Sequence, residues 1–215
     1  MRPYTFDIDP ANVDDNGIAD DLPTGTAWAF GTDAEWLATG SGDSLAHRLV
    51  VTTAGNEPGG NAPILTLVGT DQDGFAQTED ITLPNATTVE STKYWSTVTS
   101  GTTQAATIGT FDIGWVDEVM TKLLPINYRA HEPATHAVDV TGTINYTVQE
   151  TLEEIHPQLN AGTPENLSWF PITALTAKAA DLKEPGELHS SAVRLVVNSY
   201  TSGAEIKWVV FQNED

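Results

Sequence analysis

Apolar and polar residues alternate over short runs along most of the chain, and turn-forming residues end each run. Leu49–Thr53 and Ile64–Gly69 are two such runs, rich in Val, Ile, Leu and Thr. A period of two residues, closed by Gly, Pro, Asn or Asp, is typical of half-buried β-strands. Ala137–Thr151 is the longest run, with Ile144 and Val148 among the residues of its apolar face and Thr, Asn and Gln on the other. It therefore predicts a strand with one dry and one wet face.

Turn signals between the runs define the fold class. Thr70–Gly74 contains an Asp-Gly pair, which supplies the positive-φ residue of a tight hairpin. The runs at 191–200 and 204–212 predict a second hairpin. Residues 152–190, with four prolines, predict loops, a strand at 168–175 and one or two helical turns at 174–182. About a dozen strands with almost no helix predict an all-β protein of the β-sandwich or jelly-roll type.

The strand pattern restarts near residue 120. We therefore expect an extended N-terminal arm at 1–25, a first β-sandwich unit at 26–119 and a second at 120–215. A single sandwich with long connections is the alternative.

The charge balance narrows the possible partners. The chain has 9 Lys and Arg against 30 Asp and Glu, a net charge of −21, so it repels nucleic acid and anionic lipid. Such a charge favours solubility, docking on a basic surface or a salty environment. The absence of cysteine excludes disulfides and cysteine zinc sites, and favours assembly in a reducing cytoplasm. The acidic N-terminus does not resemble a signal peptide, and no apolar run approaches the roughly 20 residues of a membrane-spanning helix.

Catalytic patterns are missing from the sequence. No serine lies in a Gly-x-Ser-x-Gly elbow, and Gly59-Gly60 is not followed by the Lys and Ser or Thr of a phosphate loop. His131 and His136 flank Glu132 at a spacing that suits neither helix nor strand ligands. With 30 acids, pairs such as Glu79-Asp80 arise by chance. The sequence predicts no enzymatic activity.

One acidic turn imitates a calcium loop. Its oxygen-bearing side chains are spaced around Gly17, which allows a sharp bend, but no Glu closes the loop as a bidentate ligand. Asp, Asn and Gly also cluster in ordinary turns. The candidate calcium ligands are Asn12, Asp14, Asn16 and Asp20, and no other cofactor is expected.

Three segments are the expected contact surfaces: the N-terminal arm Tyr4–Asp21, the hairpin tip Asp71–Gly74 and the loop Pro157–Pro171. Unpaired strand edges and extended arms offer hydrogen-bonding groups to neighbouring chains. The residues expected to make these contacts are Tyr4, Phe6, Ile8, Asp71, Asp73, Gly74, Pro157, Trp169 and Phe170.

Several longer motifs together resemble a family of structural proteins of tailed bacteriophages. They mark strands and turns rather than a chemical site, and they extend over most of the chain; only 152–190 departs from the pattern. They are Asp9–Val13, Asn16–Ala19, Arg48–Asn56, Leu67–Glu79, Pro84–Tyr94, Thr97–Ser100, Phe111–Glu118, and the segments 139–151 and 193–212.

The resemblance implies a place in the virion, reached after assembly in the host cytoplasm. The expected role is a capsid decoration (cement) protein that binds the major capsid protein and self-associates, with a trimer favoured. A neck or tail ring or adaptor is the first alternative. A carbohydrate-binding β-sandwich module is the second, and it requires an exposed planar row drawn from Trp28, Trp36, Trp95, Trp169 and Trp208. Neither nucleic acid nor membrane is an expected partner.

Overall fold

The computed structural model describes residues 2–23, 27–29, 33–53, 63–83, 87–103, 110–127 and 133–212. Antiparallel strands form nearly all of its regular structure, and the α-helix found in these ranges, α1 (Ile155–Ala161), has seven residues. The all-β prediction is confirmed.

The chain forms two compact units. The first unit is Val13–Val116, and the second unit combines Met1–Asn12 with Asp117–Asp215. The sequence places a division near residue 119 and assigns residues 1–25 to an arm. In the structure, the first twelve residues belong instead to the same unit as the C-terminal half.

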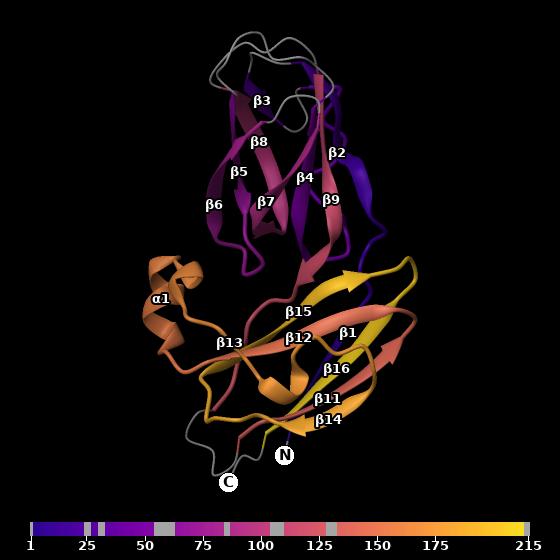
Figure 1. Cartoon of the computed structure of the whole chain (residues 1–215). Coiled ribbons are helices and arrows are strands. Elements are labelled where there is room, and N and C mark those ends of the chain that lie inside the picture. The colour runs from indigo at the N-terminus through magenta and orange to yellow at the C-terminus, as the bar shows by residue number, and fades with distance from the viewer. Residues whose placement is uncertain are drawn as a thin grey trace. The chain divides into compact units, whose positions relative to one another are not determined.

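The first unit contains two antiparallel sheets (Figure 1). One has the order β3-β8-β5-β6, and the other joins β2 and β4 to β9, with β7 on the far side of β4. Alternate residues of these strands, such as Leu49, Leu67 and Ile113, are buried, as the period of two predicts. The strands are β2 (Asp14–Pro23), β3 (Ala27–Ala29), β4 (Ala46–Thr53), β5 (Ile64–Thr70), β6 (Ala76–Thr82), β7 (Thr88–Trp95), β8 (Thr97–Thr103) and β9 (Thr110–Met120).

A buried carboxylate, Glu79 of β6, links the two sheets of the first unit. Its Oε1 accepts hydrogen bonds from the backbone N–H of Thr92 (2.6 Å) and the Thr92 hydroxyl (2.8 Å). Its Oε2 accepts from the backbone N–H of Lys93 and the indole N–H of Trp95, both at 3.3 Å. One side chain therefore satisfies four donors of β7, a strand of the other sheet.

Replacing Glu79 with Ala should lower the free energy of unfolding by about 2–4 kcal/mol, because it leaves buried donors of β7 without an acceptor. The adjacent Asp80 is exposed, and its carboxylate accepts a hydrogen bond from the Thr66 hydroxyl. Asp80→Ala is the matched control and should cost less than about 1 kcal/mol. Urea denaturation measures both, and equal costs would contradict this role for Glu79.

The second unit is also built from two antiparallel layers (Figure 1). One sheet has the order β1-β16-β11-β14, and the other places β12 between β13 and β15. β15 also pairs with β10 and with the end of β9, where Val119 faces Val197. The strands are β1 (Arg2–Ile8), β10 (Leu124–Pro125), β11 (Thr135–Thr141), β12 (Ile144–Thr151), β13 (Phe170–Pro171), β14 (Leu182–Pro185), β15 (Ala192–Tyr200) and β16 (Glu205–Gln212).

The hairpin predicted at the C-terminus is wrong. β15 and β16 are consecutive but lie in different sheets, so the turn at Thr201–Ala204 carries the chain from one layer to the other. Both strands bury an apolar face, which they place against the common core rather than side by side. The single strand predicted at Ala137–Thr151 is also wrong: the chain changes sheets at Gly142, whose φ of 80° suits glycine, and forms β11 and β12 in different layers.

Residues 155–185 differ from the loops predicted there. Pro157 is the third residue of α1, where a helix has no internal partner for a backbone N–H, so proline is tolerated. The expected helical turns at 174–182 reduce to a 3₁₀ turn, η2 (Thr173–Leu175), before β14. This segment also covers the outer edge of β12: Ile172 N–H donates to the Val148 carbonyl at 3.0 Å, and Lys178 exchanges two hydrogen bonds of 2.8 Å with Tyr146.

The start of the expected N-terminal arm is a strand. β1 pairs with β16 over its whole length, from Arg2 opposite Gln212 to Ile8 opposite Ile206. Ile8 is buried, and the Phe6 ring stacks on Trp208 with centroids 5.1 Å apart. The alternation of Tyr4, Phe6 and Ile8 suits one short strand, and in the structure that strand is paired in a sheet, with Ile8 buried and Tyr4 38% exposed.

Candidate functional site

The tip Asp71–Gly74 forms the hairpin turn that the sequence predicts between β5 and β6. The Asp71 carboxylate accepts hydrogen bonds from the N–H groups of Asp73 (2.9 Å) and Phe75 (2.8 Å). Gly74 has a φ of 87°. Burial of the Asp71 side chain raises its pKa, and the backbone bonds act in the opposite direction. The Asp71 carboxylate thus stabilises the turn. Contact with a partner at this tip stays a prediction.

Hydrogen bonds join three of the candidate calcium residues to one another. The Asn16 side-chain amide donates to Asp20 Oδ1 at 3.1 Å, and the Asn16 backbone N–H donates to Asp14 Oδ1 at 3.2 Å. Asn12 ends the N-terminal segment of the second unit. In the parts of the chain that are described, no group of three or more His, Cys, Asp or Glu residues could hold a metal ion.

Chelation should therefore leave the thermal midpoint unchanged. The acidic residues at 14 and 20 already accept hydrogen bonds from Asn16, so these contacts need no cation to form. Melting curves with and without EDTA test this. If EDTA lowers the thermal midpoint by several degrees and calcium reverses the change, the calcium-loop hypothesis is supported.

The segment Pro157–Pro171 combines packed and exposed side chains. Trp169 is partly buried, packs against a cluster of Ile155, Leu167 and Ala192, and lies beneath the Arg194 guanidinium at 4.2 Å. Phe170, on β13, is 50% exposed. A hollow of about 240 Å³ beside α1 is lined by Pro125, Ile126, Leu152 and Ile155 among others. Of the contact residues predicted here, Pro157 and Phe170 are exposed and Trp169 is partly buried.

Ser41, Asp43 and His47 approach one another without forming a nucleophilic triad. Asp43 lies between the other two: its Oδ1 accepts from the Ser41 hydroxyl at 2.7 Å, and its Oδ2 lies 2.7 Å from His47 Nε2. A nucleophilic serine must bond the histidine itself. Asp43 also accepts the Leu45 N–H at 2.9 Å, so the cluster anchors the turn before β4.

His136 is the most deeply buried histidine in the described ranges. It has 0% exposure, neither ring nitrogen has a hydrogen-bond partner, and the ring stacks on Trp208 at 5.9 Å. Burial lowers the pKa of His136 to about 4. Glu150, which accepts the Ser190 hydroxyl at 3.0 Å, is also buried, and burial raises its pKa. His131 and Glu132 lie outside the described residues.

Most tryptophans belong to the cores. Trp36, Trp95, Trp115 and Trp208 are at most 7% exposed. Trp169 is partly buried, and the side chain of Trp28 is outside the described part. Trp36, Trp95 and Trp208 therefore cannot form the exposed row that a sugar-binding platform requires.

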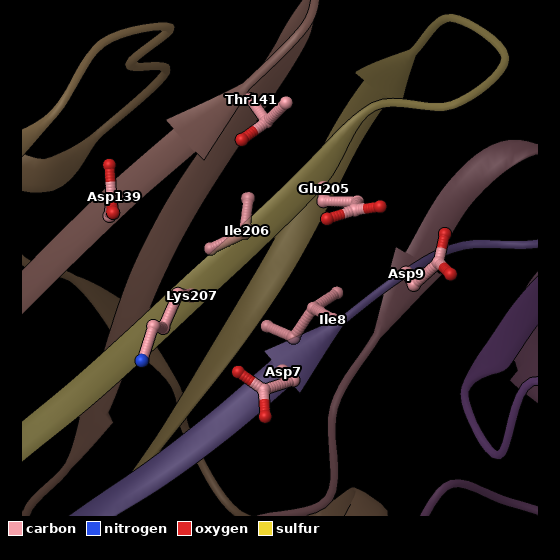
Figure 2. Close-up of a pocket in the computed structure, with 8 residues that line it drawn as sticks. All are labelled: Asp7, Ile8, Asp9, Asp139, Thr141, Glu205, Ile206 and Lys207. Carbon is pink, nitrogen blue, oxygen red and sulfur yellow. The ribbon is translucent and has the colours of Figure 1, made fainter.

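Figure 2 shows an acid-lined hollow of about 280 Å³ on the exposed face of the β1-β16-β11 sheet. Asp7 comes from β1, Asp139 from β11, and Glu205 and Lys207 from β16; Asp9 follows β1. Ile8 and Ile206 complete the middle of the hollow. Four carboxylates and one ammonium group give it a negative field that attracts a basic group.

Sequence reasoning missed this hollow because its acids come from three strands that are distant along the chain. Asp7 and Asp139 both lie opposite Lys207 in the strand register. Their alternation with apolar neighbours marks an exposed face, but nothing local indicates which strands become neighbours.

No helix in the described ranges combines the length and apolar character needed to cross a membrane. No known protein-family model matches the chain, and no curated protein matches it.

Proposed function

We propose that the protein is a non-enzymatic structural component of a tailed-phage virion, and specifically a capsid decoration protein that binds the major capsid shell. It would be incorporated after assembly in the host cytoplasm and would self-associate, with a trimer as the expected state. Rigid antiparallel layers and a strongly acidic surface suit a protein that adheres to neighbours outside the packaged DNA.

One observation carries the proposal: three of the phage-like motifs meet in a single hydrogen-bonded cluster. Leu49, in the motif Arg48–Asn56, donates its N–H to Ser91 Oγ at 2.8 Å, and Ser91 donates to the Lys93 carbonyl at 2.8 Å. Glu79, at the end of Leu67–Glu79, accepts from the Thr92 and Lys93 N–H groups. Ser91, Thr92 and Lys93 all belong to Pro84–Tyr94.

The motif residues thus join strands to one another. Arg48 adds a further tie, since its Nε donates to the Ser91 carbonyl at 2.9 Å and its guanidinium pairs with Glu90 at 3.0 Å. Motifs that mark a reaction would instead gather reactive groups around a cavity. The residues that resemble the phage proteins hold the strands together. The resemblance therefore supports a shared fold, and a structural protein of a particle depends on its fold rather than on a reactive site.

Purified virions of the phage that encodes this chain provide the test. Mass spectrometry should find the chain in the particles, and cryo-electron microscopy should place its β-layers on the capsid shell at symmetry-related positions. Density at the neck or tail would replace the decoration role with the ring or adaptor role. Absence from purified particles would refute both.

A further inference from the structure

β1 has one edge that pairs with no strand in the described ranges. β1 is the terminal strand of its four-stranded sheet, and its seven residues pair with β16 without a register shift. No described strand pairs with its other edge. An edge of this length presents a row of backbone N–H and C=O groups that can accept another strand.

The outer edge of β12, in contrast to that of β1, is covered by another segment of the chain. Residues 170–178 cover the outer edge of β12 through backbone hydrogen bonds from Ile172 and Lys178. Natural proteins protect edges by such coverage, by bulges, by charged side chains or by proline. β1 has no bulge in its pairing; its charged residues are Arg2 and Asp7, and Pro3, near its start, is its single residue without an N–H.

Charges alternate across the sheet toward this edge of β1. On the exposed face, Asp139 of β11, Lys207 of β16 and Asp7 of β1 lie in register, one strand after the next (Figure 2). Directly opposed residues of neighbouring strands point to the same face and interact, and opposite charges there are favourable. A further strand beside β1 would place its own side chain next to Asp7, at the acid-lined hollow.

We propose that β1 accepts an extended segment of a partner protein, in which the residue opposite Asp7 is a lysine or arginine. That side chain continues the row Asp139–Lys207–Asp7 and lies near Asp9 and Glu205 in the hollow. This proposal rests on the proposed function. It states that the chain binds a neighbouring virion protein by strand addition, with a basic side chain of that partner beside Asp7.

A second copy of this chain fits the edge less well. Pairing two β1 strands would bring together surfaces of a protein with a net charge of −21. Antiparallel pairing of two β1 strands about Thr5 would also place Pro3, which carries no positive charge, opposite Asp7. The row Asp139–Lys207–Asp7 therefore favours a partner with a basic residue opposite Asp7, and self-association would use other surfaces.

Two blocked synthetic peptides test the proposal on the full chain: Thr-Val-Thr-Lys-Thr-Val-Thr and the same peptide with Glu in place of Lys. The Lys peptide should bind about tenfold more tightly, since exposed charge pairs contribute modestly. In hydrogen exchange it should slow the amides of β1. A third peptide with Pro in place of both Val residues cannot add a strand and should not bind.

Asp7→Lys should invert the preference between the Lys and Glu peptides, because the exposed position tolerates the change and reverses the local charge. Glu154→Lys is the matched control: Glu154 is exposed, belongs to the same unit and lies outside the hollow. It makes the same charge change and should preserve the preference.

Equal binding of both charged peptides, an equal effect of the two variants, or no protection of β1 would overturn the proposal. So would concentration-dependent protection of β1 in the free chain, which would make a second copy the occupant. If the chain is found in virions but shows no preference between the peptides, only the strand-addition proposal is refuted and the virion role stands. Peptide preference in a chain absent from virions would leave the edge site standing and refute the virion role.

Discussion

Acidification from pH 7 to pH 4 should destabilise the second unit through His136, by about 3 kcal/mol more than in a His136→Phe variant. The pKa of His136 is about 4 in the folded protein, because burial disfavours the charged ring, against 6.5 for an ordinary histidine. The unfolded chain therefore binds a proton more readily over this range. Stability is complete above about pH 6.5 and falls until the pH reaches about 4.

Glu150 acts in the opposite direction in the same unit. Burial raises the pKa of Glu150, so acidification relieves the cost of its charge and adds stability; burial raises the pKa of Asp71 likewise, but Asp71 belongs to the first unit. The overall slope is consequently smaller than the His136 contribution alone. Comparison with His136→Phe isolates that contribution, because the carboxyl groups are unchanged and an aromatic ring still faces Trp208.

Denaturant unfolding at several pH values measures the effect. His156, exposed on α1, provides the control: His156→Gln should keep the wild-type pH dependence. Equal slopes for the wild type and His136→Phe would show that His136 does not control acid stability. Glu184 faces His136 in the register with β14, so Glu184→Gln tests whether that carboxylate alters the slope.

Trp208→Ala should lower the free energy of unfolding of the second unit by about 3–5 kcal/mol, the usual cost of removing a buried aromatic side chain. Trp208 has 0% exposure and stacks on Phe6 from β1 and on His136 from β11. Its ring thus joins three strands of one sheet. Truncation removes both stacking contacts and leaves a cavity.

Phe170→Ala is the matched control for Trp208→Ala, because Phe170 lies in the same unit but is 50% exposed. It should cost less than about 1 kcal/mol. Urea denaturation with near-ultraviolet circular dichroism follows both variants. Similar costs for the two would contradict the assignment of Trp208 to the centre of the core.

Local patterns explain which parts of the fold were predictable. Alternation within β4, β5 and β12 reflects burial of one strand face, and the Asp-Gly turn at 73–74 is determined by neighbouring residues. The pairing of β15 and β16 was predicted wrongly because two apolar strands joined by a short turn can pair by their edges or face each other across a core. Sequence alone does not separate these two arrangements.

Contacts between distant residues account for most of the rest. Glu79 finds its donors 13 to 16 residues along the chain, and the hollow brings Asp7 together with Asp139. Helix α1 was missed for a different reason. Pro157 signals a break in most settings, but in the first turn of a helix it removes an N–H that has no internal partner.

Rebinding to particles tests the central claim most directly. Labelled chain should be added to virions assembled without it and sedimented over a range of concentrations. Binding that saturates at a fixed number of copies per particle is the result expected for a decoration protein. Failure to sediment with intact particles that lack the chain would contradict a structural role on the capsid.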